Sequence, residues 1–221
     1  DYCRQAGITW ANAPGCNSGG VEQYVHSAFL LLERDRGLRL QGACLGVVGV
    51  GHVGSRVVRV GRSLGMRVLQ CDPPRAEQEG GADFCSLEEI ARTCDIITFH
   101  TPLTRSGAHP TWHLAGSSFF SSLPRHPYLL NTSRGEVVDN EALLDALKRG
   151  RVADAVLDVW ENEPNINRSL LNEVFIGTPH IAGYSGDGKA NARILEETIA
   201  YCLANPKWRL SLQTHKIINV R

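Results

Sequence analysis

Short segments that are largely apolar along their whole length alternate with helix-like segments through most of this chain. Strands of that kind are buried on both faces, as in a parallel sheet covered by helices on either side. The alternation therefore predicts an α/β fold with a doubly wound, Rossmann-type parallel sheet. The predicted strands are residues 43–50, 66–72, 95–100, 128–133, 154–160 and 173–180, and the predicted helices are residues 21–37, 52–64, 86–94, 140–150 and 188–206.

The stretch GVGHVG places glycines in a Gly-x-Gly-x-x-Gly spacing between a predicted strand and a predicted helix. In that context the backbone approaches a pyrophosphate, whose charge lies at the helix N-terminus. Asp72 ends the next strand, where a carboxylate would bind the adenosine ribose and repel a 2′-phosphate. The alternative is a tight turn with a capping aspartate. The pattern favours NAD as the cofactor, bound by Gly49, Gly51, Gly54 and Asp72.

Composition excludes several kinds of partner. Lys plus Arg equals Asp plus Glu at 23 each, so the chain has no excess charge for nucleic acid or an anionic membrane. No segment approaches the roughly 20 apolar residues that span a bilayer. The seven cysteines are scattered and form no CxxC pair, which argues against zinc and disulfides and for a reducing compartment. We expect a cytoplasmic protein with no metal site.

Three charged or titratable residues each follow a predicted strand, where ligands of open α/β sheets bind. Arg134 would fork onto a carboxylate, or it would pair on the surface with Glu136 or Asp139. Glu163 would fix the tautomer of a histidine ring, or it would be one of several solvated acids. His180, between a proline and a run of small residues, would transfer protons or would be a buried histidine with one satisfied hydrogen bond.

Arg134, Glu163 and His180, in that chain order, resemble the catalytic residues of the D-isomer-specific 2-hydroxyacid dehydrogenases. Within that family the chain is most similar to the erythronate-4-phosphate dehydrogenase subfamily. The segments that carry the likeness are APGCN, CDPPRA, DIITFHTPLT, EVVDNEALLDAL, LDVWENEP and IGTPHIAGYSGDGKA.

The resemblance implies roles for individual residues. His180 is the general acid/base, Glu163 holds it, and Arg134 binds the substrate carboxylate. The residues implied to contact NAD, besides the glycines of the turn and Asp72, are His52, Val53, Thr101, Thr132, Asp158 and Gly183. Tyr184 is expected to contact the region of the substrate phosphate. His109, His113 and His126 are expected to be exposed loop histidines.

The resemblance also implies an activity, the NAD-dependent oxidation of 4-phospho-D-erythronate at its 2-hydroxyl in pyridoxal phosphate biosynthesis, by a full-length homodimer. The alternatives are a dehydrogenase for another D-2-hydroxy acid, such as 3-phosphoglycerate, and a non-catalytic NAD-binding regulatory protein. We expect a fragment that lacks the N-terminal part of the substrate lobe and the C-terminal dimerisation domain. Its predicted parts are a lobe remnant (1–17), the NAD-binding domain (18–182), and a return helix with a C-terminal tail (183–221).

Overall fold

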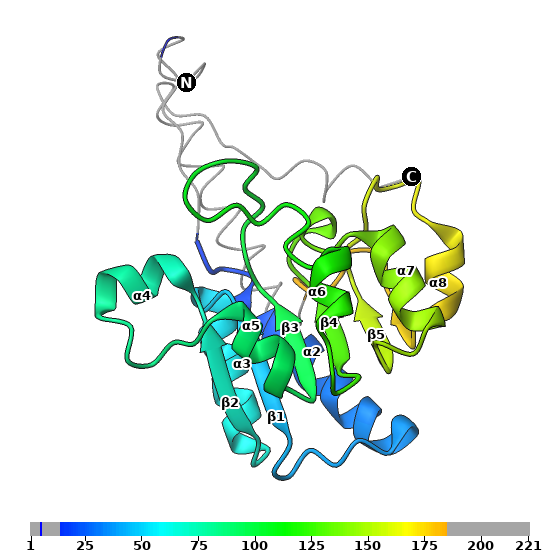
Figure 1. The fold of residues 1–221 in the computed structure, drawn as a ribbon, viewed down its shortest axis with the longest axis horizontal. Coiled ribbons are helices and arrows are strands. Elements are labelled where there is room, and N and C mark those ends of the chain that lie inside the picture. The colour runs from blue at the N-terminus through cyan, green and yellow to red at the C-terminus, as the bar shows by residue number, and fades with distance from the viewer. Residues whose placement is uncertain (1–4, 6–13, 185–221) are drawn as a thin grey trace, which may run out of the picture. The chain divides into compact units, whose positions relative to one another are not determined.

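The computed structural model describes residue 5 and residues 14–184 (Figure 1). The chain divides into two compact units, one formed by Asn17–Tyr184 and the other by Asp1–Cys16 with Ser185–Arg221. The first unit is described below. The predicted helix at 188–206 lies outside the described residues, and the predicted boundaries of the terminal parts stay predictions.

One six-stranded parallel sheet forms the centre of this unit, with the order β2-β1-β3-β4-β5-β6. Each strand lies inside a predicted strand, so the α/β prediction is confirmed. The strands are shorter than predicted because the residues that follow them turn away at the edge of the sheet and, for the last strand, because Glu173 still belongs to a helix. The strands are β1 (Cys44–Val48), β2 (Arg67–Cys71), β3 (Ile96–Phe99), β4 (Tyr128–Asn131), β5 (Asp154–Leu157) and β6 (Ile176–Gly177).

Four of the helices match predicted ones: α2 (Ser18–Arg36), α3 (His52–Ser63), α5 (Leu87–Thr93) and α7 (Asn140–Lys148). Ser86 caps α5 by accepting a hydrogen bond from the backbone N–H of Glu89 at 3.1 Å, as its sequence pattern indicates. The prediction missed α4 (Pro73–Glu79), α6 (Ser117–Ser121), α8 (Arg168–Glu173) and the 3₁₀ turn η1 (Gly135–Val137). These segments are too short to show helical periodicity.

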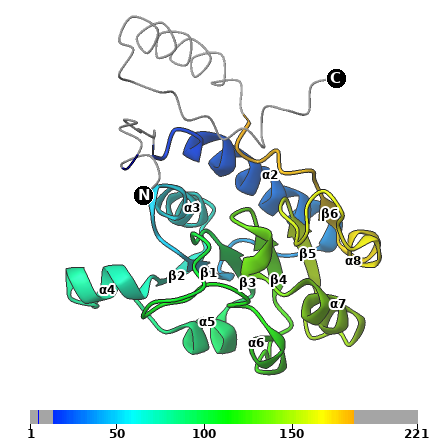
Figure 2. The same ribbon diagram turned by 90° about the horizontal axis from the view of Figure 1, so that it is seen from above.

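Helices cover both faces of the sheet, with α2 and α3 on one side and α5, α6 and α7 on the other (Figure 2). The side chains of β1 alternate between the two resulting cores. Leu45 and Val47 pack with α2 and α3, whereas Cys44 and Val48 pack with the helices of the opposite face. Because both faces are buried, every position of β1 is apolar or small, which explains the pattern seen in the sequence.

The six strands end in register at one edge of the sheet. Val48 pairs with Cys71 on one side and with Phe99 on the other, and Phe99 pairs with Asn131. The same register continues through the last residues of β5 and β6. Segments that leave the carboxyl ends of these strands therefore emerge beside one another, which is where open α/β sheets bind ligands.

Helix α2 packs closely against the segment that follows β6. The hydroxyl of Tyr24 lies 2.6 Å from the hydroxyl of Thr178, and burial raises the pKa of Tyr24 to about 12, which keeps the phenol protonated. One turn earlier, Gly20 is buried, and a Cβ there would lie 2.9 Å from the backbone of Gly183. This glycine allows close backbone contact, whereas a Cβ at Gly19 would meet nothing within 4 Å.

The two adjacent glycines of α2 should respond oppositely to alanine. Gly19→Ala should raise the free energy of unfolding by up to about 1 kcal/mol, because alanine favours a helix and the site has room. Gly20→Ala should lower it by about 1–3 kcal/mol, because the new methyl group overlaps backbone. Urea denaturation of both variants measures the difference, and equal effects would contradict the close packing against Gly183.

Candidate functional site

The glycine-rich turn after β1 forms a close-packed cradle. Gly49 has a φ of +86°, and a Cβ there would lie 2.8 Å from the carbonyl group of His100. A Cβ at Gly54 would lie 1.9 Å from the carbonyl oxygen of Gly49. Gly51 caps α3 and has open space around it. The turn thus packs tightly against β3 and α3 while its outer backbone stays accessible to a pyrophosphate at the N-terminus of α3.

Other predicted cofactor residues lie around this turn. His52 is exposed at the start of α3, and Val53 is half-buried beside it. The Thr101 hydroxyl is buried and has no hydrogen-bond partner within the described part of the chain. Its methyl group would lie 2.8 Å from a Cβ at Gly49, so this residue lines the same turn. An unsatisfied buried hydroxyl at this position fits a site that a dinucleotide completes.

The carboxylate of Asp72 is anchored at both oxygens. Oδ2 accepts the backbone N–H of Val50 at 2.7 Å, and Oδ1 accepts the backbone N–H of Arg75 at 3.2 Å. Asp72 is therefore the N-cap of α4, which was the alternative interpretation of this residue. The cap does not exclude the predicted ribose contact, because each oxygen has a second lone pair and the residue is only half-buried.

His100, which the sequence analysis did not single out, lies at the carboxyl end of β3 between two threonines. Its Nε2 lies 2.9 Å from the Thr98 hydroxyl, and its Nδ1 lies 3.3 Å from the hydroxyl of Thr132. Burial lowers the pKa of His100 to about 3, so the ring is neutral near neutral pH. The hydroxyl of Thr132, predicted to contact NAD, thus has a partner within the protein.

Arg134 is exposed where the chain leaves β4, and its Nη1 donates to the carbonyl oxygen of Ser133 at 2.7 Å. Among the described residues it forms no ion pair with Glu136 or Asp139, the surface pairing left open by the sequence. Neither of these two carboxylates therefore neutralises the Arg134 guanidinium.

Close backbone packing joins the Arg134 turn to the loop after β5. The Asn131 side chain donates to the carbonyl oxygen of Arg134 at 2.9 Å. A Cβ at Gly135 would lie 1.9 Å from the carbonyl oxygen of Trp160. Only glycine fits at this contact, and the result is a fixed position for Arg134 next to the loop that carries Glu163.

Glu163 and His180 form a hydrogen-bonded pair, with 3.0 Å between Oε2 and Nδ1. A carboxylate only accepts, so Nδ1 carries the proton and Nε2 is the ring nitrogen that has a lone pair available. The other oxygen, Oε1, accepts the backbone N–H of Trp160 at 2.8 Å. The Trp160 indole N–H in turn donates to the carbonyl oxygen of Thr178 at 3.0 Å, so one side chain ties the two loops together.

Asp158 holds the segment that presents His180. The Asp158 carboxylate is 1% exposed and accepts hydrogen bonds from the Thr178 hydroxyl and from the backbone N–H groups of Ile181 and Ala182, at 2.6–2.8 Å. His180 itself has a φ of +59°, a left-handed conformation that costs about 1–3 kcal/mol in a residue other than glycine. The Asp158 hydrogen bonds offset that cost, a positioning role that the sequence did not predict.

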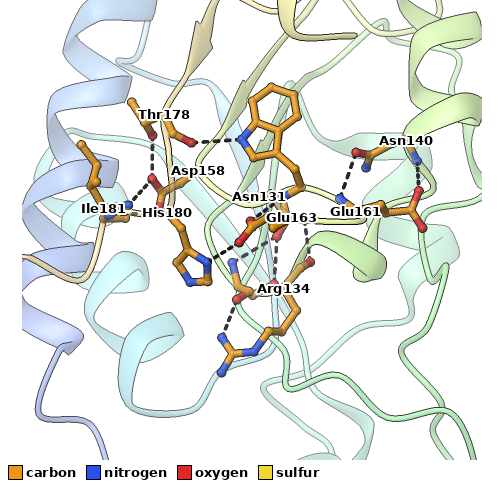
Figure 3. Close-up of polar contacts among 12 residues, drawn as sticks. Asn131, Arg134, Asn140, Asp158, Glu161, Glu163, Thr178, His180 and Ile181 are labelled. Carbon is orange, nitrogen blue, oxygen red and sulfur yellow. Dashed lines mark hydrogen bonds and ion pairs between the residues drawn. The ribbon is translucent and has the colours of Figure 1, made fainter. Parts of the chain in front are cut away.

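Figure 3 shows the ring of His180 facing Glu163, with the guanidinium of Arg134 on the same side of the loops. These residues follow β6, β5 and β4, so all three lie at the carboxyl edge of the sheet. A guanidinium can orient a hydroxy acid by binding its carboxylate. A histidine held by a side-chain carboxylate can then exchange the proton of the hydroxyl group. Gly183 is half-buried and Tyr184 is 59% exposed, and their predicted ligand contacts stay predictions.

The expectation of exposed histidines was wrong for His109 and His113, which are half-buried, whereas His126 is exposed. His113 Nε2 lies 2.6 Å from Glu161 Oε1, and its Nδ1 lies 3.6 Å from Asp139 Oδ2. At His113 the loop folds back onto the turns after β4 and β5, whereas His109 lies against α4, with its Nε2 2.8 Å from Oε1 of Glu77. No group of three or more metal-ligating side chains occurs within residues 14–184.

A sequence profile for the NAD-binding domain of D-isomer specific 2-hydroxyacid dehydrogenases matches residues 21–182. The chain belongs to this family. The match spans α2 to the segment after β6, so it includes the dinucleotide turn, Arg134, Glu163 and His180. It confirms the family expected from the motifs and identifies the described unit as an NAD-binding domain.

Curated relatives include the erythronate-4-phosphate dehydrogenases of Bacteroides thetaiotaomicron, 57% identical over 87% of this chain, and of Pseudomonas syringae pv. syringae, 51% identical over 86%. The matches cover 55% and 50% of those proteins, so the chain spans about half the length of the relatives it matches. A solved D-lactate dehydrogenase from Aquifex aeolicus, complexed with NAD and lactic acid, superposes with a TM-score of 0.76 at 27% identity, covering 94% of this chain and 72% of that one.

His100 should make the protein less stable in acid. Its folded-state pKa is lowered to about 3, so the unfolded ring binds a proton below about pH 6.5 while the folded ring does not. Stability should therefore fall as the pH drops from about 6.5 towards 3, by up to about 1.4 kcal/mol per pH unit. His100→Gln should flatten this slope in urea denaturation series, and the exposed His126→Gln should leave it unchanged. Identical slopes in both variants would contradict the burial of a neutral ring.

Asp158→Asn should destabilise the protein and loosen the His180 segment. The amide places an NH₂ group against a backbone N–H, so at least one buried hydrogen bond is lost, at a cost of about 1–3 kcal/mol. Asp145→Asn, on the exposed surface of α7, is the matched control and should change the free energy of unfolding by less than about 0.5 kcal/mol. Hydrogen exchange at Ile181 and Ala182 should speed up in Asp158→Asn alone, and unchanged exchange would argue against the positioning role.

Proposed function

We propose that this protein contributes to the NAD-dependent oxidation of 4-phospho-D-erythronate at its 2-hydroxyl, a step of pyridoxal phosphate biosynthesis. The observation that carries the proposal is the Glu163–His180 pair at the same sheet edge as Arg134 and the dinucleotide turn. The substrate is supported by relatives named erythronate-4-phosphate dehydrogenase at 57% and 51% identity.

His180 acts as the general base. Its Nε2 takes the proton of the 2-hydroxyl, and the ring becomes positively charged. Glu163 accepts a hydrogen bond from Nδ1–H, with 3.0 Å between Nδ1 and Oε2. It thereby stabilises that charge and keeps Nε2 directed at the substrate. Bound NAD+ would supply the hydride acceptor for C2 while the hydroxyl becomes a keto group. In the reverse direction His180 returns its proton to the oxygen.

Arg134 orients the substrate. Its guanidinium forks onto the carboxylate and cannot lose its charge, so the C2 hydroxyl is held towards His180. Tyr184, exposed at the end of the described segment, is proposed to contact the phosphate region. The glycine-rich turn, with His52, Val53 and Thr101, would hold NAD, and Asp72 would accept hydrogen bonds from the adenosine ribose and disfavour the 2′-phosphate of NADP.

The proposed partner is a small phosphorylated hydroxy acid. We expect the full-length protein to act as a homodimer in the cytoplasm, without nucleic acid. Every helix in the described part of the chain is too short or too polar to cross a membrane.

Opposite pH trends should mark the role of His180. Oxidation of 4-phospho-D-erythronate needs the neutral ring, so kcat should rise with pH, whereas reduction of the keto acid needs the protonated ring and should fall. His180→Asn should lower kcat by roughly 10²–10⁴-fold and remove both trends, with NAD affinity retained. Glu163→Gln in the His180→Asn background should cost little more, because the two residues act as a unit.

The measurement is the pH–rate profile of the protein and its variants in both directions, with NADH formation or consumption as the signal. Calorimetric titration with NAD+ verifies that each variant still binds the cofactor. A His180→Asn variant within a few-fold of the unmodified protein would remove His180 from the chemistry. Turnover of other D-2-hydroxy acids with none of 4-phospho-D-erythronate would instead overturn the proposed substrate.

A further inference from the structure

We propose that Glu79 is a specificity-determining residue, which keeps Arg75 from binding the 2′-phosphate of NADP. The inference rests on the proposed binding of NAD by this domain. Asp72 is the residue expected to reject NADP, yet an arginine that would attract a phosphate lies in α4, the short helix that Asp72 caps. The position of that arginine needs an explanation, and its contacts supply one.

The Arg75 guanidinium lies at the dinucleotide turn. Its Nη1 donates to the carbonyl oxygen of Val50 at 2.6 Å, while the backbone N–H of the same Val50 donates to Asp72. The backbone N–H of Arg75 also donates to Asp72. Three hydrogen bonds thus link Arg75, Val50 and Asp72, so the positive charge is adjacent to the carboxylate that would face the ribose hydroxyls.

Glu79 occupies the outer edge of that guanidinium. Its two carboxylate oxygens accept from Nε and Nη2 of Arg75, both at 2.7 Å, in a bidentate pair. Glu79, and Asp72 to a lesser extent, raise the pKa of Arg75, which reflects how close the two negative charges lie. A phosphate is recognised by the same fork, so it would have to displace Glu79 from Arg75.

The charges around the turn give the physical reason for the effect. Asp72 and Glu79 together contribute two negative charges against the one positive charge of Arg75, a net repulsion for a 2′-phosphate. Removing Asp72 alone leaves Arg75 neutralised by Glu79. Removing Glu79 as well leaves the Arg75 guanidinium without an ion-pair partner among the described residues, next to the expected position of the ribose.

The experiment is a calorimetric titration of the full-length protein with NAD+ and NADP+, in the unmodified protein and in variants. In the Asp72→Ala background, Glu79→Gln should tighten NADP+ binding by about three- to tenfold, the range expected for one partly exposed charge acting on a phosphate. With Asp72 present, Glu79→Gln should also tighten NADP+ binding, but by a smaller factor. NAD+ affinity should change by less than about twofold, because NAD+ places no charge at the 2′ position.

Four controls separate this mechanism from others. Adding Arg75→Ala to the pair of substitutions should abolish the gain, and raising the salt concentration should shrink it. Asp145→Asn breaks the comparable i,i+4 pair with Arg149 on α7 and should leave both affinities unchanged. Adenosine 2′,5′-bisphosphate should show the same gain as NADP+, and 5′-AMP should show none.

The inference is overturned if Glu79→Gln leaves NADP+ affinity unchanged in both backgrounds, or if the gain persists without Arg75. Normal NAD+ binding in that case leaves the proposed function standing. If the unmodified protein binds neither NAD+ nor NADP+, the proposed function and this inference both fail.

Discussion

The in-register parallel pairing of the strands determines where this protein can do chemistry. Both faces of the sheet are buried under helices, so polar side chains in the strands would lack water. At the carboxyl edge of the sheet, polar side chains can reach water again, and all the strands end at this edge in register. Asp72, Arg134, Asp158 and His180 follow four different strands, yet they emerge beside one another because Cys71, Asn131, Leu157 and Gly177 end those strands in register.

Glycines and one buried carboxylate convert that edge into a rigid site. Gly135 lets the Arg134 turn pack against the backbone of Trp160, and Gly20 lets α2 pack against Gly183. Asp158 then holds the strained segment of His180 through three hydrogen bonds. The Glu163–His180 pair is thus fixed by backbone contacts on several sides, as the proposed proton transfer requires.

Part of this arrangement was predictable from sequence because it depends on local spacing. The strand–glycine–helix context identified the turn at Gly49, and the position after the next strand identified Asp72. The roles of Gly20, Gly135 and His113 were not predictable, because each depends on a partner far away in the chain that no local pattern reveals. Helix α4 was missed since its seven residues show no periodicity, and with it the Arg75–Glu79 pair.

Burial separates the two aspartates that end strands of this sheet. Both accept backbone N–H groups and therefore look alike as capping residues. Asp158 is 1% exposed and accepts three donors from the chain itself, so its carboxylate is committed to the fold. Asp72 is half-buried and accepts two, which leaves lone pairs available for further donors. The same residue type in equivalent positions thus stabilises a loop in one case and stays open to a ligand in the other, and the difference follows from how many donors the neighbouring backbone supplies.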